Sequence, residues 1–166
     1  PDQIELLRRF GFKVFYGDAT RIDLLTAAGA AKARALVLAI DDIDDSLALA
    51  DAVRENFPDL PILARARNVT HMYQLMDRGV TIVERETFES ALQLGRRALS
   101  QLGFGADRAR EAMLKCREDN KNSVDAVYPY YKDREQYVSM AKRARDELNA
   151  MFARDLKNID NETDQG

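Results

Sequence analysis

The chain has 166 residues, of which 46% are hydrophobic and 32% are charged, a composition typical of soluble globular proteins and too apolar for a disordered chain. Its formal net charge is −3, which argues against nucleic acid as the main partner, because phosphate binding needs a concentrated basic face. The longest uninterrupted apolar run, residues 35–40, is much shorter than the roughly 18 residues of a membrane-spanning helix, and we expect no secretory leader.

The residue types that usually carry enzyme or metal chemistry are sparse. Cys116 is the single cysteine and has no CxxC partner or histidine at metal-ligand spacing, so we expect a reducing, cytoplasmic compartment and no metal site. His71 is the only histidine, and no nucleophile or carboxylate stands at a known triad spacing from it. A helix-surface or capping role is therefore favoured for His71, and we expect no catalytic residues.

Short apolar runs alternate with helical patterns through the first half of the chain. Residues 12–17, 35–40, 61–64 and 80–83 are predicted strands, and most of them are almost continuously apolar, which is typical of parallel strands buried on both faces. The segments between them have the length and the period of crossover helices. This order predicts an α/β fold with a doubly wound parallel sheet, that is, a Rossmann-like domain.

The front of the chain departs from this scheme. Residues 1–10 have a helical pattern that stops at Gly11 and leads directly into the strand predicted at residues 12–17. A doubly wound nucleotide-binding domain instead begins with a strand that lies centrally in the sheet, a Gly-rich turn and a helix. We therefore expect a fragment whose sheet lacks its first strands.

After the last predicted strand the pattern becomes helical. One apolar stripe runs from Phe88 to Leu102, a Gly-Phe-Gly break follows, and two more helices extend to about residue 154. Tyrosines at positions 128, 130, 131 and 137 favour either a dimerisation arm or packing on the chain's own domain. We predict a partial Rossmann-like domain at residues 1–84, a helical dimerisation region at residues 85–156, and an acidic disordered tail at residues 157–166.

Polar side chains follow each predicted strand at its carboxyl end, where ligands bind in open parallel sheets. These residues are Asp18, Asp41, Asp42, Arg65, Arg67 and Arg85. Arg65 and Arg67 stand two apart, so they point to the same face if the strand persists.

The turn at residues 16–20 has two interpretations. Gly17 permits a tight turn, Asp18 can bond an amino or hydroxyl group, and the following helix N-terminus can attract an anion. Alternatively, Asp18 or Thr20 simply caps that helix, and the local pattern alone favours this second interpretation.

Arg85 also has two interpretations. It lies between Glu84 and Glu86, so its guanidinium can hold a ligand carboxylate in a bidentate manner or be neutralised by the flanking acids. The spacing alone favours the structural role.

Several of these segments together resemble a known family. GDAT at residues 17–20, AIDD at residues 39–42, ARAR at residues 64–67 and ERETFE at residues 84–89 are similar to the cytoplasmic KTN (TrkA-N, or RCK) domain of the Kef glutathione-gated potassium efflux systems. The resemblance runs from residue 1 to about residue 122. GDAT and AIDD are typical of the wider KTN family, whereas ERETFE and the helix leading to Asn120 resemble the Kef systems specifically.

The resemblance implies a regulator without turnover of its own, which gates a potassium/proton antiporter. Glutathione holds such systems shut, and glutathione adducts of electrophiles open them. By this likeness Arg85 pairs with a glutathione carboxylate and Asn120 bonds its peptide backbone, and we hypothesise that Phe88 is the aromatic group that an adduct displaces. The helical region at residues 85–156 then also carries the glutathione site.

The same resemblance implies a bound nucleotide, either AMP or NAD(H). Its expected lining combines the turn after the first predicted strand with the ends of the next two, namely Asp18, Ala19, Thr20, Ile40, Asp41 and Arg65. Expected partners are a second copy of the chain, a membrane transport domain of the same protein and an ancillary quinone-oxidoreductase-like subunit. The expected location is the cytoplasmic face of the bacterial inner membrane.

Two other function classes stay open at this point. A KTN domain of another potassium channel or transporter, gated by nucleotide alone, would share GDAT and AIDD but bind no glutathione. An NAD-dependent oxidoreductase domain would need a hydride-acceptor site and a proton donor, and neither is evident in the sequence.

Overall fold

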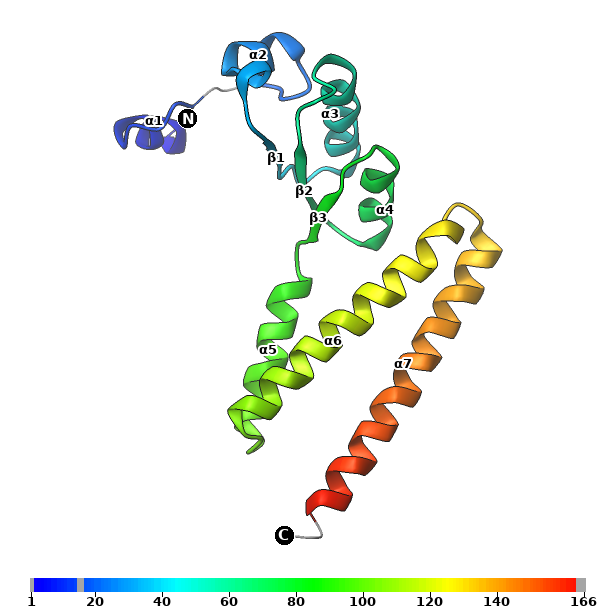
Figure 1. Ribbon diagram of the computed structural model, residues 1–166. Coiled ribbons are helices and arrows are strands. Elements are labelled where there is room, and N and C mark those ends of the chain that lie inside the picture. The colour runs from blue at the N-terminus through cyan, green and yellow to red at the C-terminus, as the bar shows by residue number, and fades with distance from the viewer. Residues whose placement is uncertain (1, 15–16, 164–166) are drawn as a thin grey trace. The chain divides into compact units, whose positions relative to one another are not determined.

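The computed structural model describes residues 2–14 and 17–163. These residues form two compact units, residues 1–86 and residues 87–166, which are each described by themselves. The first unit contains a parallel sheet with helices, and the second consists of helices (Figure 1). Within the described ranges, no helix has both the length and the apolar character needed to cross a membrane.

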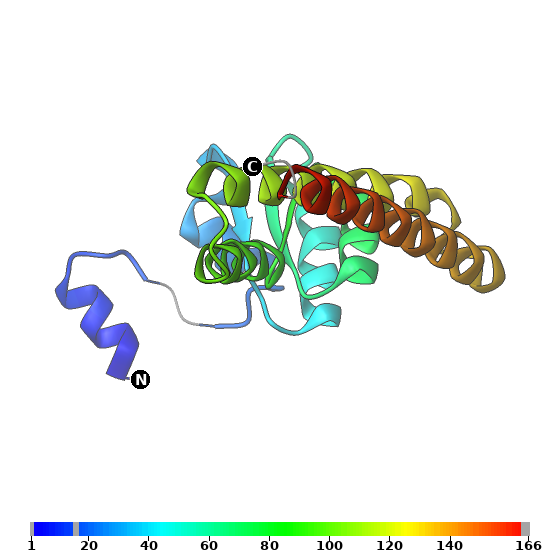
Figure 2. The same cartoon turned by 90° about the horizontal axis from the view of Figure 1, so that it is seen from below.

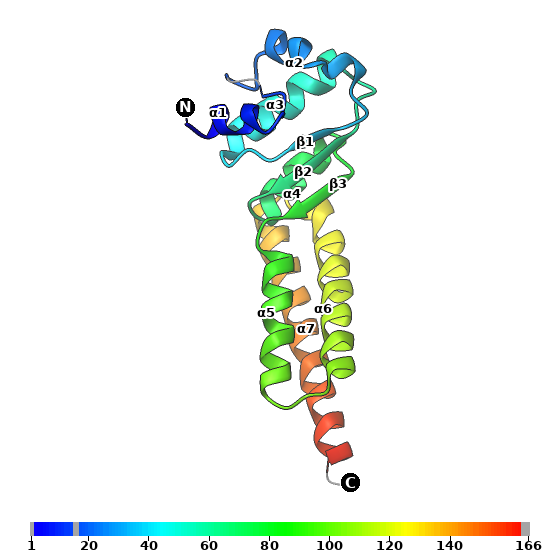
Figure 3. The same cartoon turned by 90° about the vertical axis from the view of Figure 1, so that its left-hand side faces the viewer.

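The sheet of the first unit has three strands, β1 (Leu36–Leu38), β2 (Ile62–Ala66) and β3 (Ile82–Arg85), in the order β1-β2-β3. Both pairs are parallel, with Leu36 opposite Ile62 and Ala66 opposite Arg85, and the three arrows point the same way in Figure 3. Helices long enough to serve as crossovers connect the parallel strands. α3 (Ile43–Asn56) joins β1 to β2, and α4 (Val69–Asp77) joins β2 to β3. The predicted α/β class with a parallel, Rossmann-like sheet is therefore confirmed.

The prediction of a strand at residues 12–17 is wrong for the part that can be described. Residues 12–14 follow α1 (Asp2–Arg9) without strand structure, and residues 15 and 16 lie outside the described ranges. The Phe12 N–H donates back to the Leu7 carbonyl at 3.1 Å, and Arg8 donates to the Val14 carbonyl at 3.1 Å. A strand needs a hydrogen-bonded neighbour, and residues 12–14 pair with none of the three described strands.

The last strand begins two residues later than predicted, at Ile82 instead of residue 80. Gly79 takes a left-handed conformation with φ of 72°, and the N–H groups of Gly79 and Val80 donate to the Met76 and Leu75 carbonyls at 2.9 and 3.1 Å. This is the Schellman closure of a helix end. It uses the backbone of residues 79 and 80, so the strand starts beyond them.

The core lies on the face of the sheet that α3 and α4 cover (Figure 1). Side chains alternate along the strands, so Leu38, Ala64 and Ala66 point into this core and are at most 6% exposed. α2 (Ile22–Ala28) adds Leu25 to the same cluster. On the other face Val37 and Ile82 are 72% and 52% exposed, so only one face of the described sheet is covered.

Arg54 of α3 joins the loops that enter β2 and β3. Its Nε donates to the Arg78 carbonyl at 3.2 Å, its Nη1 to the Leu60 carbonyl at 3.2 Å, and its Nη2 to the Gly79 carbonyl at 2.8 Å. These carbonyls lie before the two strands, at the end of the sheet opposite the carboxyl edge. Arg54 therefore fixes the base on which the carboxyl edge is built.

We expect Arg54→Met to lower the free energy of unfolding by about 2 kcal/mol, because three hydrogen bonds from a charged donor to loop carbonyls, two of them partly buried, are lost together. Arg54→Lys keeps the charge but reaches fewer carbonyls, so its loss should be intermediate. Urea unfolding monitored by circular dichroism measures both. A change below about 0.5 kcal/mol for Arg54→Met would show that the bonds to the loops are not stabilising.

The second unit contains α5 (Phe88–Gln101), α6 (Ala106–Val127), the short 3-10 helix η2 (Tyr128–Tyr130) and α7 (Arg134–Thr163). α5 and α6 pack against each other, and α6 and α7 lie alongside each other in the view from below (Figure 2). Tyr128 and Tyr131 stack at the turn with ring centroids 5.9 Å apart. Asp133 caps α7 by accepting from the N–H groups of Glu135 and Gln136 at 3.0 and 3.1 Å.

The helix α7 continues through residues 157–163, where the sequence predicts a disordered tail. Met151, Phe152, Leu156 and Ile159 extend a helical spacing of apolar residues past residue 154, which the acidic composition of the segment obscures. Residues 164–166 lie outside the described ranges.

Candidate functional site

The turn after residue 17 is closed by Asp18. Asp18 Oδ1 accepts from the Thr20 N–H at 2.8 Å and from Thr20 Oγ1 at 2.7 Å, and these hydrogen bonds lower the pKa of Asp18. The N-cap residue of α2 is Arg21, which makes no side-chain cap bond, so neither Asp18 nor Thr20 caps that helix. Ala19 packs against the core, and Asp18 lines a shallow hollow of about 250 Å³ with Gly17 and Leu24.

Four charged side chains meet at the carboxyl edge of the sheet. Arg65 pairs with Asp41 and donates from Nη2 to the Ala39 carbonyl at 2.9 Å. Arg67 Nη1 lies 3.0 Å from Glu86 Oε2 and 3.9 Å from Asp41 Oδ1, and Arg65 Nη1 lies 3.6 Å from Glu86 Oε1. We call Asp41, Arg65, Arg67 and Glu86 the edge cluster. Its two positive and two negative charges balance.

The edge cluster still has capacity for a ligand. The Asp41 side chain is 78% exposed, so much of its carboxylate faces solvent. The Arg65 Nε is buried and has no hydrogen-bond acceptor among the described groups. A buried donor without an acceptor costs free energy, but a ligand reaches Arg65 through the exposed part of its side chain, which is 32% exposed. Carboxylate and guanidinium groups together suit a ligand that carries both hydroxyl and anionic oxygens.

In the structure, the predicted nucleotide residues fall into two separate groups. Asp18, Ala19 and Thr20 form one turn, and Ile40, Asp41 and Arg65 lie around the ends of β1 and β2, with Ile40 packed partly against the core. Among the described residues no hydrogen bond or ion pair links Asp18 or Thr20 to Asp41 or Arg65. Arg67 and Glu86 belong to the same edge cluster, and the list of expected nucleotide residues lacks them.

Arg85 lies on the other face of the sheet from Arg65. The register places Arg65 opposite Glu84 and Ala66 opposite Arg85, and successive side chains of a strand point to opposite faces. Arg85 is half-buried, and this burial lowers its pKa, while Tyr73 and Glu84 act in the other direction. Arg85 thus points away from Arg65, although the residue after it, Glu86, belongs to the edge cluster.

The other two expected glutathione residues, Phe88 and Asn120, belong to the second unit. Phe88 lines an apolar groove of about 490 Å³ between α5 and α6, together with Leu92, Leu99, Met113 and Cys116. Asn120 is half-buried on α6, one turn beyond Cys116.

An ion pair joins α5 to α6 close to these residues. Arg117 Nε donates to Glu89 Oε1 at 2.9 Å and its Nη2 pairs with Oε2, so the contact is bidentate. The hydrogen bonds from Arg117 lower the pKa of Glu89. Because Glu89 is the residue after Phe88 and Arg117 stands one helical turn before Asn120, this pair sets the register of the two helices that carry the expected ligand residues.

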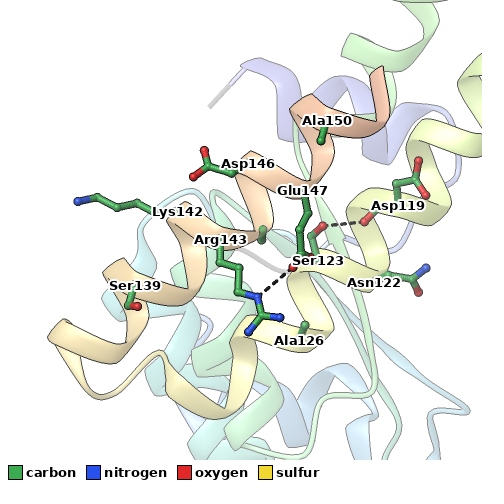
Figure 4. A pocket seen from close by; sticks show the side chains of 11 residues that line it. Asp119, Asn122, Ser123, Ala126, Ser139, Lys142, Arg143, Asp146, Glu147 and Ala150 are labelled. Atoms are coloured by element: carbon green, nitrogen blue, oxygen red, sulfur yellow. Dashed lines mark hydrogen bonds and ion pairs between the residues drawn. The ribbon is translucent and has the colours of Figure 1, made fainter. Parts of the chain in front are cut away.

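A second groove, of about 900 Å³, lies between α6 and α7 and was missed from the sequence (Figure 4). Its lining mixes small residues, such as Ala126 and Ala144, with charges of both signs, and Arg143 Nε donates to Glu147 Oε1 at 2.9 Å. The signal in the sequence is the recurrence of alanine and serine on facing helices, which leaves space between them.

The helix-surface alternative for His71 is wrong, whereas its Nδ1 accepts from the Arg67 N–H just before α4, which is a capping contact. His71 lies in the first turn of α4 with its side chain turned inward and is 0% exposed. It shares the buried face of α4 with Leu75, one turn later. The helical spacing by itself indicates that position 71 lies on this buried face. The sequence prediction places His71 on the surface because histidine is a polar residue type.

Comparison with known proteins decides the family. The TrkA-N domain family model matches residues 1–86, which is more than half of the chain. The chain belongs to the TrkA-N family. The model of the potassium efflux system KefB C-terminal domain matches residues 90–166, so the likeness to Kef systems extends well past residue 122, where the sequence motifs ended.

Curated relatives support a KefC-like TrkA-N domain. The glutathione-regulated potassium-efflux system protein KefC of Escherichia coli O139:H28 and that of Salmonella arizonae are each 46% identical over 159 residues, which is 96% of this chain. The chain spans 26% of the length of these relatives.

Solved structures agree with this membership. The Shewanella denitrificans Kef CTD in its AMP-bound form has a TM-score of 0.69 and 42% identity, covering 72% of this chain and 75% of that chain. The TrkA-N domain of the inner membrane protein ybaL from Escherichia coli has a TM-score of 0.51 and 24% identity over 61% of this chain and 71% of that one. The ybaL domain supports the fold alone.

The buried histidine of this TrkA-N domain predicts a pH-dependent stability. Burial, and to a smaller extent the charge of Arg78, lowers the pKa of His71 below its ordinary value of 6.5. Below pH 6.5 the unfolded chain takes up a proton that the folded chain does not, so stability is full above this pH and is lost as the pH falls.

We expect His71→Gln to remove this loss. Between about pH 7.5 and about pH 5.5, the free energy of unfolding of the wild type should fall by more than that of the variant. Urea unfolding at both pH values measures the difference, and no other histidine contributes because the chain has one. Equal pH dependence in the two proteins would contradict the depressed pKa.

Proposed function

We propose that this chain is the cytoplasmic ligand-sensing domain of a potassium/proton antiporter, closed by glutathione and opened by glutathione adducts. The observation that carries the proposal is the 46% identity to KefC over 96% of the chain. The names of these relatives describe a glutathione-regulated potassium-efflux system, which is consistent with a regulator that catalyses no reaction of its own. Its natural location is the cytoplasmic face of the bacterial inner membrane.

A nucleotide is proposed at the carboxyl edge of the sheet, and AMP is favoured over NAD(H) because the solved structure of the Shewanella denitrificans Kef CTD is in an AMP-bound form. Asp41 offers an exposed carboxylate for ribose hydroxyls, and Arg65 offers the exposed part of its guanidinium for phosphate oxygens. Asp18, Ala19 and Thr20 supply the second wall through their turn, and Ile40 supplies an apolar contact. When bound, the nucleotide adds anionic charge to an edge cluster that is neutral by itself.

Glutathione is proposed to bind through Arg85, Asn120 and Phe88. A half-buried guanidinium binds a carboxylate more strongly than an exposed one, because less water competes. The Asn120 amide can both donate to and accept from a peptide bond. Phe88 is the aromatic side chain that a bulky S-substituent displaces, which lets an adduct favour a different state from glutathione itself.

A second copy of the chain is the proposed partner of the helical unit. The groove between α5 and α6 is apolar, and Leu94 and Leu102 are 69% and 75% exposed, more apolar surface than a solitary helical hairpin usually leaves in water. The membrane transport domain of the same protein is proposed to receive the signal, and an ancillary quinone-oxidoreductase-like subunit is a further proposed partner.

The second candidate function is a KTN domain gated by nucleotide alone. The matches to GDAT and AIDD are compatible with it, whereas the KefB C-terminal domain match at residues 90–166 favours the Kef systems. Glutathione binding separates the two candidates directly.

For the nucleotide, we expect Asp41→Asn to weaken AMP binding about tenfold, equivalent to roughly 1.4 kcal/mol, because the variant loses the charged acceptor for the ribose. The matched control is Asp44→Asn, an exposed acid in the first turn of α3, which should change affinity less than about twofold. Calorimetric titration of AMP and of NADH into the same proteins measures both effects. Unchanged or tighter AMP binding by Asp41→Asn would remove Asp41 from the proposed site.

For glutathione, we expect calorimetry to detect binding to the wild-type chain and a loss of about tenfold or more in Arg85→Ala, because the carboxylate partner is gone. The control is Arg34→Ala, an exposed arginine before β1, which should bind like the wild type. Circular dichroism first establishes that all three proteins fold. A folded wild type without glutathione binding would favour the nucleotide-only candidate.

The role of Phe88 is tested separately. Phe88→Leu should keep the affinity for glutathione but change the ratio of its affinities for glutathione and for a glutathione S-conjugate. If this ratio equals that of the wild type, the displacement of Phe88 is not part of the switch.

A further inference from the structure

His71 is buried at the point where two turns of the first unit meet. It is 0% exposed, as is Ser46, and these are the two buried polar residues of the described chain. The Arg67 N–H donates to His71 Nδ1 at 3.2 Å, and His71 Nε2 lies 3.2 Å from Ser46 Oγ. The ring therefore makes one hydrogen bond to each of two different segments.

These hydrogen bonds determine the tautomer of the ring. Because the Arg67 backbone donates to Nδ1, that nitrogen carries no proton, so the proton of the neutral ring is on Nε2 and is donated to Ser46 Oγ. A protonated ring would place a second donor against the Arg67 N–H and would break this bond. The neutral ring is thus the form that links the two segments.

The two segments are the turns that hold the edge cluster. Arg67 directly follows Ala66, the last residue of β2, and its side chain pairs with Asp41 and Glu86. Ser46 lies in the first turn of α3, and its N–H donates to the carbonyl of Asp42, the N-cap residue that follows Asp41. One imidazole therefore spans from the backbone beside Arg65 and Arg67 to the helix start beside Asp41.

We propose that His71 is a positioning residue for the nucleotide site, which acts through Ser46 and the Arg67 backbone to hold Asp41 and Arg65 at the separation that the ligand requires. This inference rests on the proposed nucleotide function. It assigns a role to a buried polar pair that packing alone does not need, because an apolar side chain could fill the same volume without desolvating two polar groups.

Charged groups around the ring support a positioning role over a role in contact with the ligand. Arg78, the residue after α4, acts on the ring, but its Nε donates to Asp51 of α3 at 2.8 Å, so its charge is paired. The carboxylates of Asp41 and Glu86 are engaged by the two arginines of the edge cluster. The ring itself has no solvent exposure, so it reaches a ligand only through Ser46 and Arg67.

The test compares AMP affinity with folding stability in matched variants. Ser46→Ala removes the hydroxyl that accepts from His71 and is expected to weaken AMP binding about fivefold. Val53→Ala is the control, because Val53 is also fully buried on α3 but lies two helical turns after Ser46, away from the start of that helix. It should lower the free energy of unfolding by at least as much as Ser46→Ala while it leaves AMP affinity unchanged.

A double-mutant cycle then asks whether the effect travels through Asp41. In the Asp41→Asn background, Ser46→Ala should cost less than twofold in AMP affinity, because the group that it positions is already gone. His71→Gln, whose side-chain amide can still donate to Ser46 Oγ, should retain more affinity than His71→Leu. A purely structural role would give the same loss in both backgrounds.

The outcomes separate the two proposals. If the wild-type chain binds AMP but Ser46→Ala binds it equally well, or weakens it no more than Val53→Ala does, the positioning role is overturned and the nucleotide site stands. If the folded wild type binds no AMP, the proposed nucleotide function fails and the positioning role fails with it.

Discussion

Parallel pairing of β2 with β1 and β3 is the constraint on which the rest of the first unit depends. This pairing brings the carboxyl ends of all three strands to one edge, so the edge cluster assembles from residues that are up to 45 positions apart in the chain. The same register places Arg65 and Arg85 on opposite faces of the sheet. A slip of one residue in β3 would reverse this division, because side chains alternate between faces.

The turns that carry the edge cluster are held in fixed positions, and the cluster still exposes polar groups to which a ligand could bind. Its ion pairs are partly exposed, so they contribute little to stability by themselves, and the order comes instead from the buried groups beneath them. Arg54 fixes the loops at the base of the strands, and the Ser46–His71–Arg67 chain of hydrogen bonds fixes the turns at their upper ends. A ligand that meets such a preorganised edge does not have to order these turns itself, which lowers the cost of binding.

The helical unit is held together differently. Apolar contacts between α5 and α6 are incomplete, since a groove lined by Phe88 and Leu92 remains between them. The bidentate Glu89–Arg117 pair adds direction that apolar packing lacks, because a guanidinium and a carboxylate join in one preferred geometry. Between α6 and α7 the small side chains leave a still larger groove.

The sequence alone determined the features that depend on neighbouring residues, and the tertiary structure decided those that depend on residues distant in the chain. Local periodicity was sufficient for the alternation of strands and helices, and four short motifs were sufficient for the TrkA-N family and the likeness to Kef systems, because both depend on neighbours in the chain. Tertiary structure alone decided that residues 12–14 form no strand, that Arg67 and Glu86 join Asp41 and Arg65, and that His71 is buried between two turns. Each of these depends on a partner that is distant in sequence, and the pattern around a residue carries no record of which partner folding brings to it.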